Sequence, residues 1–185
     1  MIQIKNINKS WTLFLDRDGV INHEKHNDYV HKWDEFVFYD NAIEAIKILS
    51  SVFNRIIVVT NQKGIGKGLT LLEDLEEIHD KMKAAITNAG GRIDEVYFCP
   101  DLEENSPYRK PNPGMGIKAK VQFPEIDFSK SIMVGNTLSD MEFGRNLGAF
   151  TVFVATTRPE VSKEDNRIDL YVDTLYQFAA KFTNQ

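Results

Sequence analysis

The segment RIIVVTN, residues 55–61, carries an unbroken run of apolar side chains at 56–59. A strand with one face in water alternates apolar and polar residues, so a run without alternation predicts a strand buried on both faces, as in a parallel sheet covered by helices. Shorter β-compatible runs lie at residues 12–16, 95–100, 131–136 and 150–156. Strands of this kind require helices on both sides of the sheet, which constrains the fold more than any other feature of the chain.

Helical patterns separate these runs, at residues 41–52, 70–90, 112–123, 138–149 and 174–182. Asn41 is the expected N-cap of the first helix, and Gly90 and Gly91 are expected to close the second. The alternation predicts one α/β domain over residues 1–185, a doubly wound, three-layer sandwich with a central parallel sheet. Residues 22–38 are predicted to form an irregular insert, and residues 100–113 a long loop.

Composition excludes several classes of protein. The net charge of -5 gives no general attraction to nucleic acid or to anionic membranes. No apolar run is long enough to span a bilayer, and the N-terminus has no apolar signal-peptide segment. The single cysteine, Cys99, excludes an internal disulfide framework. We therefore expect a cytoplasmic monomer without nucleic-acid or membrane partners.

Polar side chains follow the predicted strands at the points where the strands end. In an open α/β sheet, ligands bind at the carboxyl ends of the strands, so these side chains are expected to converge on one site. The candidate site residues are Asp16, Asp18, Thr60, Asn61, Arg109, Lys110, Asn136 and Asp140.

This mixture of side chains suits phosphoryl chemistry. Carboxylates bind a hard cation such as Mg²⁺, and Lys and Arg neutralise phosphate oxygens. One carboxylate can attack phosphorus and a second can act as general acid and base. Asp16 and Asp18 are expected to point to the same side of an extended segment, and Arg17 away from them.

Each part of the pattern also has an ordinary interpretation. Paired aspartates at a strand end often form a turn or a helix cap, as do Thr60 and Asn61. Lys110 alone is typical of a solvated loop, and Asp140 of a helix surface. The order of these residues and their placement at the strand ends favour a functional site over these alternatives.

Four segments of the chain resemble the motifs of the haloacid dehalogenase (HAD) superfamily: FLDRDGV, VVTNQ, RKPNPGM and VGNTLSDM. The resemblance runs from about Thr12 to Thr156. Within the superfamily the chain is similar to small phosphatases that act on heptose 1,7-bisphosphate and on histidinol phosphate, and its longer motifs look more like the heptose enzymes. Members of this type lack a large cap domain.

The resemblance implies a role for each motif residue. Asp16 would be the nucleophile and a Mg²⁺ ligand, and Asp18 the general acid and base, with its backbone carbonyl on the metal. Thr60 and Asn61 would hold the phosphoryl group. Lys110 would balance the charge of the aspartyl-phosphate. By the same resemblance, Arg109 would contact a small phosphorylated substrate.

The fourth motif departs from the family pattern. The family usually has an aspartate after the glycine of this motif, as a direct metal ligand, and this chain has Asn136. An amide oxygen can bind Mg²⁺ but brings no charge, so weaker metal binding is predicted. Asp140 is expected to compensate in part, either directly or through water.

A second departure concerns zinc. Relatives often carry a Cys-x-His and a Cys-x-Cys pair before the Arg-Lys-Pro sequence, and the matching positions here are Cys99, Asp101, Ser106 and Tyr108. A structural zinc site needs four good ligands, so zinc is not expected. The loop is then expected to be held by packing, and Cys99 to be a buried thiol.

Other features carry less weight. The sequence GIGKG at 64–68 does not match a P-loop, although Lys63 or Lys67 could reach a second phosphate. His79 is expected on the helix surface. Three hypotheses stay open: a Mg²⁺-dependent heptose bisphosphate phosphatase, a phosphatase for histidinol phosphate or another small phosphomonoester, and a catalytically weak protein that binds a phosphorylated ligand or a partner.

Overall fold

The computed structural model describes residues 6–183, whose strands all belong to one six-stranded parallel sheet. The strand order is β3-β2-β1-β4-β5-β6. The strands are β1 (Thr12–Leu15), β2 (Arg55–Asn61), β3 (Glu95–Cys99), β4 (Ser131–Gly135), β5 (Phe150–Val154) and β6 (Leu170–Val172). The chain builds outward from β1 to β3, then returns and builds outward from β4 to β6, so the predicted doubly wound parallel sheet is confirmed.

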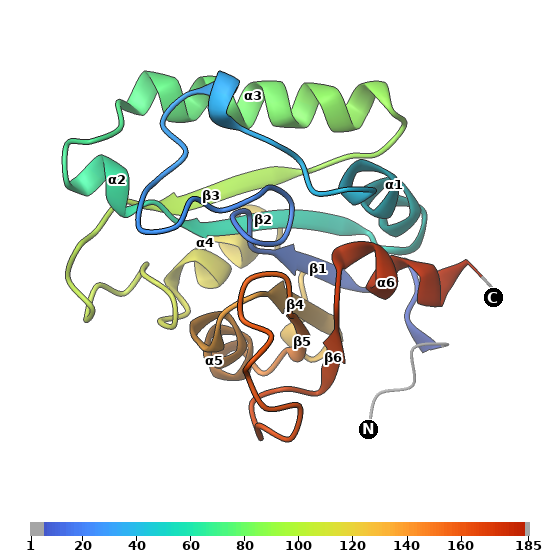
Figure 1. Ribbon diagram of the computed structural model, residues 1–185. Helices are drawn as coiled ribbons and strands as arrows, with labels where there is room; N and C mark the ends of the chain where they lie inside the picture. Colours follow the sequence, from blue (N-terminus) through green and yellow to red (C-terminus); the bar gives the residue numbers. More distant parts are fainter. Residues whose placement is uncertain (1–5, 184–185) are drawn as a thin grey trace.

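Helices cover both faces of this sheet (Figure 1). They are α1 (Ala42–Val52), α2 (Lys63–Gly66), α3 (Leu72–Asn88), α4 (Gly114–Gln122), α5 (Leu138–Leu147) and α6 (Leu175–Ala179). Apolar residues of α1, α3 and α6 pack with Leu13 and Leu15 of β1 in one core. Phe14, which points to the opposite face, packs with residues of α4 and α5 in a second core. Both faces of β1 are therefore buried, as the three-layer sandwich requires.

The structure corrects some local predictions. Asn41 precedes α1 but has a left-handed backbone, with φ of 60°, and its side chain makes no capping hydrogen bond. The side chain of Thr137, by contrast, accepts from the backbone N–H of Asp140 and caps α5. The strand β6 and the short helix α2 were not predicted from the sequence.

The insert at residues 22–38 lies over the carboxyl ends of β1 and β2 (Figure 1). Its apolar anchor is an aromatic cluster in which the Trp33 and Phe36 rings stack with centroids 5.1 Å apart, and Phe38 meets Phe36 edge-on at 4.9 Å. The sheet order reverses between β1 and β4, so their carboxyl ends form the crevice in which such folds bind ligands. Among residues 6–183, no helix is both long and apolar enough to cross a membrane.

Candidate active site

A polar cavity of about 160 Å³ opens at the carboxyl ends of β1, β2 and β4. The fold brings together in it all the predicted site residues except Arg109. The lining residues are Asp16, Asp18, Glu24, Thr60, Asn61, Lys110, Asn136, Thr137, Ser139 and Asp140. The side chain of Arg109 instead donates to the backbone carbonyl of Asp101, at 3.2 Å.

Asp16 directly follows β1 and is almost fully buried. Its Oδ1 accepts a hydrogen bond from the backbone N–H of Arg17 at 2.8 Å and lies 2.9 Å from Lys110 Nζ. Burial raises the pKa of Asp16 to about 7, and the nearby Asp140 carboxylate adds to the rise while Lys110 opposes it. A bound cation in the same cavity would favour the ionised form, which is the nucleophilic one.

Lys110 is held in place from both ends. The Asn61 side chain accepts from the backbone N–H of Lys110 at 3.0 Å and donates to its carbonyl at 3.1 Å. The ammonium lies between Asp16 and Asp140, at 2.9 and 2.6 Å. Burial by itself would lower the pKa of Lys110, but the two carboxylates outweigh burial and raise it, so the side chain is a fixed positive charge.

Asp140 uses both carboxylate oxygens within the protein. Oδ1 accepts from Lys110 Nζ, and Oδ2 accepts from the backbone N–H of Thr137 at 3.0 Å and from its hydroxyl at 2.7 Å. The bond from the Thr137 backbone is half of the capping box at the start of α5, whose other half is the Asp140 backbone N–H donating to Thr137 Oγ1 at 3.2 Å. A direct metal bond would compete with the bonds that the carboxylate accepts, so the geometry favours the water-mediated alternative for Asp140.

Arg17 does not point away from its neighbours as expected. Its side chain is fully buried, and its guanidinium contacts the Asp18 carboxylate through Nη2, which lies 3.0 Å from each Asp18 oxygen. Asn22 and Gln62 also donate to Asp18, at 2.9 and 2.8 Å. Burial alone would raise the pKa of Asp18, but the Arg17 charge and these donors together lower it.

His79 is likewise not on the surface. Its ring is buried, and Nε2 lies 3.0 Å from Arg17 Nη1. A guanidinium can only donate, so Nε2 must be the acceptor and the imidazole neutral. Burial and the Arg17 charge lower the pKa of His79 to about 3. The position was readable in the sequence, because His79 falls on the apolar face of α3, beside Ile78 and four residues after Leu75.

The sequence analysis missed several residues that line or support the cavity, among them Gln62, Glu24, Thr137 and Ser139. Gln62 donates to Asp18 and also to Thr60 Oγ1, at 2.9 Å, and so ties β2 to the end of β1. Glu24 comes from the insert at 22–38 and lines the cavity beside Asp18. Gln62 follows directly after Thr60 and Asn61, which was a usable signal, whereas nothing local to Glu24 indicates its position.

The donor set of the cavity fits a magnesium ion. Asn136 is fully buried and its Oδ1 has no hydrogen-bond partner among the described residues. Its Nδ2 donates to Thr157 Oγ1 at 2.7 Å and faces Glu24 Oε2 at 3.3 Å, which fixes the orientation of the amide. An unpartnered buried oxygen beside Asp16 and Asp18 is a vacant acceptor of the kind a hard cation takes.

A second hollow, of about 360 Å³, adjoins this cavity and shares Asp18, Glu24 and Asn61 with it. Its basic side chains include Lys25 and Arg158, and the His26 ring also lines it. Lys63 and Lys67, which the sequence suggested for a second phosphate, do not line either space. The Lys67 ammonium lies over the Tyr29 ring, 5.3 Å from its centroid.

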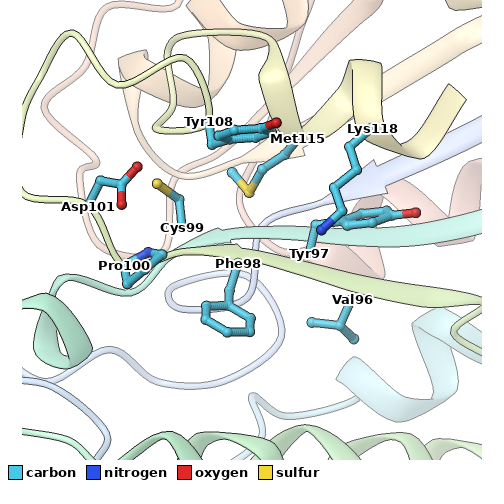
Figure 2. A pocket seen from close by; sticks show the side chains of 9 residues that line it. All are labelled: Val96, Tyr97, Phe98, Cys99, Pro100, Asp101, Tyr108, Met115 and Lys118. Atoms are coloured by element: carbon cyan, nitrogen blue, oxygen red, sulfur yellow. The ribbon is translucent and has the colours of Figure 1, made fainter. Parts of the chain in front are cut away.

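Three of the four positions that match a zinc loop, Cys99, Asp101 and Tyr108, line another hollow of about 360 Å³, beside β3 (Figure 2). Figure 2 shows Cys99 and Tyr108 on one side of the strand and Phe98 on the other. Within residues 6–183, no group of three or more His, Cys, Asp or Glu side chains is placed to hold a metal ion. The Ser106 hydroxyl donates to the Asp101 carboxylate, and Cys99 is buried, which raises the pKa of its thiol.

Hydrogen bonds, more than the expected packing, hold this loop. The Asn112 side chain donates to the carbonyls of Ser106 and Glu104, at 2.8 and 3.1 Å. Tyr108, expected to help pack the loop, is about half exposed, at 48%. The loop therefore fixes the backbone that precedes Lys110 through polar contacts.

Comparison with known proteins places this geometry in a family. Residues 12–180 match the family described as polynucleotide kinase 3 phosphatase. The chain is 35% identical over 170 residues to D-glycero-alpha-D-manno-heptose-1,7-bisphosphate 7-phosphatase of Mycobacterium tuberculosis, covering 91% of this chain and 90% of the relative. It is 33% identical over 182 residues to the corresponding beta-heptose enzyme of Salmonella typhi, covering 94% and 95%.

A solved structure agrees with these relatives. D,D-heptose 1,7-bisphosphate phosphatase from B. bronchiseptica, complexed with magnesium and phosphate, superposes with a TM-score of 0.84 at 26% sequence identity. The match covers 94% of this chain and 98% of the other. Fold and sequence thus point to the same group of proteins.

Proposed function

This chain belongs to the HAD-like phosphatases, in the family described as polynucleotide kinase 3 phosphatase, and from that membership we propose that it is a Mg²⁺-dependent phosphomonoester hydrolase. The proposed substrate is D-glycero-D-manno-heptose 1,7-bisphosphate, from which the phosphate at position 7 is removed. The observation that carries the proposal is the buried contact between Asp16 and Lys110, at 2.9 Å, inside a cavity of about 160 Å³. A nucleophilic carboxylate beside a fixed cation suits attack on a phosphate ester.

In the first step, an Asp16 oxygen bonds to phosphorus while the bond from phosphorus to the sugar oxygen breaks. Asp18 gives its proton to the departing sugar oxygen. Asp18 is ionised in the free protein, because Arg17, Asn22 and Gln62 favour its charged form. The incoming phosphate brings negative charge into the cavity and raises the Asp18 pKa, so Asp18 takes up a proton from solvent as the substrate binds.

In the second step, water attacks the phosphorus of the aspartyl-phosphate and Asp18 takes a proton from that water. The bond from phosphorus to Asp16 breaks and inorganic phosphate leaves. Asp18 then releases its proton to solvent, because the negative charge of the phosphate has gone and the Asp18 pKa falls again. Lys110 stabilises the negative charge that grows on the phosphoryl oxygens in both steps. Asn61 keeps Lys110 in place through its two backbone bonds.

Mg²⁺ would be held by Asp16, the backbone carbonyl of Asp18 and the free Oδ1 of Asn136. When bound, it supplies Lewis-acid polarisation of a phosphoryl oxygen and neutralises phosphate charge. Zinc is not part of the proposal. Of the four positions that would hold zinc ligands, one carries a cysteine, and a structural zinc site needs four good ligands. We also propose a monomer that takes no nucleic-acid partner.

The second phosphate of the substrate is proposed to lie in the adjoining hollow. Arg158 lines that hollow, and its ion pair with Glu24 is long, at 3.4 Å. Lys25 is more firmly engaged, 2.9 Å from Glu35. Arg158 Nη1 also donates to Thr157 Oγ1 at 2.8 Å, so Arg158 is proposed to bind the distal phosphate through its other guanidinium nitrogens.

Phosphate release from a panel of phosphomonoesters, with and without Mg²⁺, tests the proposal. The panel contains both anomers of heptose 1,7-bisphosphate, histidinol phosphate and a 3′-phosphorylated oligonucleotide. Mg²⁺-dependent turnover concentrated on the heptose is the expected result. Preference for another compound would contradict the substrate and keep the chemistry, and no turnover of any compound would favour a protein that only binds phosphorylated ligands.

A further inference from the structure

The cation site of this chain lacks a charge that its family usually provides. Asn136 stands where an aspartate is usual, and its amide offers Oδ1 as a neutral donor. Mg²⁺ binds most strongly where carboxylates offset its charge. Asp140 offsets this only in part, because both of its oxygens are engaged by Lys110 and Thr137, so a further carboxylate near Asn136 would strengthen the site.

Glu24 is in that position. Its Oε2 lies 3.3 Å from Asn136 Nδ2, and its side chain lines the same cavity as Asp16 and Asp18. The side chain is 30% exposed, so it can move, and its other oxygen lies 3.4 Å from Arg158 Nη1. Glu24, which is remote in sequence, thus contacts Asn136, the residue that stands where the family usually has an aspartate.

The charges around the cavity depend on this residue. The carboxylates that line it are those of Asp16, Asp18, Glu24 and Asp140. The cations paired with them are Arg17, Lys110 and Arg158. Glu24 and its partner Arg158 cancel one another, so Glu24 adds net negative charge to the cavity when its side chain turns from Arg158 toward the ion and the waters of the ion.

Asn136 and Glu24 also fit one another chemically. An amide can donate to Glu24, whereas an aspartate at 136 would place a second carboxylate against it. The amide lies directly against the Gly19 backbone, because a Cβ built on Gly19 would lie 1.9 Å from Asn136 Nδ2. The absence of a side chain at Gly19 thus leaves room for the amide where it meets both Glu24 and Thr157.

We propose that Glu24 supplies the carboxylate charge that Asn136 lacks, and that it positions Mg²⁺ by accepting hydrogen bonds from the water that the ion retains. Mg²⁺ keeps several waters when it binds to proteins, and carboxylates that hold such waters act as outer partners of the metal. This inference rests on the proposed Mg²⁺-dependent function, but it concerns metal affinity and needs no substrate.

Isothermal titration of the full chain with Mg²⁺ alone tests the inference in a double-mutant cycle. Glu24→Gln is expected to weaken Mg²⁺ binding about 10-fold or more, as is typical when an outer partner of a metal is removed. Asn136→Asp in the Glu24→Gln background is expected to restore binding, because it returns a carboxylate to the site. Glu35→Gln is the matched control, since Glu35 lies in the same insert and bonds to Lys25 and the backbone of His31 outside the cavity.

The outcomes separate the inference from the proposed function. Unchanged Mg²⁺ affinity in Glu24→Gln, or an equal loss in Glu35→Gln, would overturn the inference and leave the function standing. Absence of Mg²⁺ binding in the unaltered protein would overturn both. Phosphate release that requires Mg²⁺, together with a weakened Glu24→Gln variant that Asn136→Asp rescues, would support both.

Discussion

Lys110 Nζ donates to Asp140 Oδ1 over 2.6 Å, with both side chains almost fully buried. Asp140 is at the same time the acidic partner in the capping box of α5. The loop after β3 is thereby joined to the first turn of α5, and the cation that faces Asp16, the proposed nucleophile, is fixed by a helix cap. The shared Lys110 ties the chemistry of the cavity to the stability of the fold.

Asp16→Asn is expected to abolish turnover, with a loss of at least about 10⁴-fold in kcat, because an amide cannot attack phosphorus. Single-turnover assays on the heptose bisphosphate measure this. Asp101→Asn, in the loop after β3, is the control and should retain activity. Turnover by Asp16→Asn within 10-fold of the unaltered protein would exclude Asp16 as the nucleophile.

Lys110→Met is expected to lower the free energy of unfolding by about 3–5 kcal/mol, because it leaves Asp16 and Asp140 buried without their cation. Denaturant titration measures the change. Lys118→Met, on the exposed face of α4, should change it by less than about 0.5 kcal/mol. Equal stability of the two variants would show that the buried carboxylates protonate without cost.

The sheet could be predicted from the sequence because its central strands are buried on both faces. The apolar run at residues 56–59 admits few other folds. The strand β6, Leu170–Val172, was missed because three residues carry no periodic signal and its place at the sheet edge depends on pairing with β5. Asn41 was wrong as a capping side chain, because its left-handed backbone directs the side chain elsewhere.

The sequence predicted that polar residues at the strand ends form one site. It did not predict which of these side chains contact one another. Arg17 was expected to point away from Asp16 and Asp18 by the alternation of a strand, and that alternation stops where β1 ends at Leu15. Its long side chain then turns onto Asp18 and His79. The position of Glu24 depends on how the irregular insert at residues 22–38 folds over the sheet, and no local sequence pattern predicts that.

Arg158→Gln is expected to raise KM for the heptose 1,7-bisphosphate by about 10- to 100-fold, because the variant loses one charge-assisted hydrogen bond to the distal phosphate. The effect on the corresponding heptose 7-phosphate should be smaller, because that compound has no distal phosphate. The ratio of kcat/KM for the two compounds is the measurement. Arg167→Gln, in the same loop but paired with Asp165, should leave the ratio unchanged. If Arg158→Gln also left the ratio of kcat/KM for the two compounds unchanged, the distal phosphate would have to bind elsewhere.

His79 is expected to make the protein sensitive to acid. Its pKa is lowered to about 3 in the folded state, against an ordinary value of 6.5, so the unfolded chain binds a proton that the folded chain does not. The stability that neutral His79 permits is therefore complete above about pH 6.5 and is lost as the pH falls toward 3. The loss amounts to about 2 kcal/mol between pH 6.5 and about pH 5.

His79→Gln keeps an acceptor for Arg17 and cannot take up a proton, so it should remove that part of the pH dependence. Urea unfolding across this range measures the free energy of unfolding of both proteins. The His26→Gln variant, altered at an exposed position in the insert, should retain the slope of the unaltered protein. If His79→Gln and the unaltered protein lost stability in parallel on acidification, His79 would have to be protonated in the folded state, and its contact with Arg17 could not be the one described.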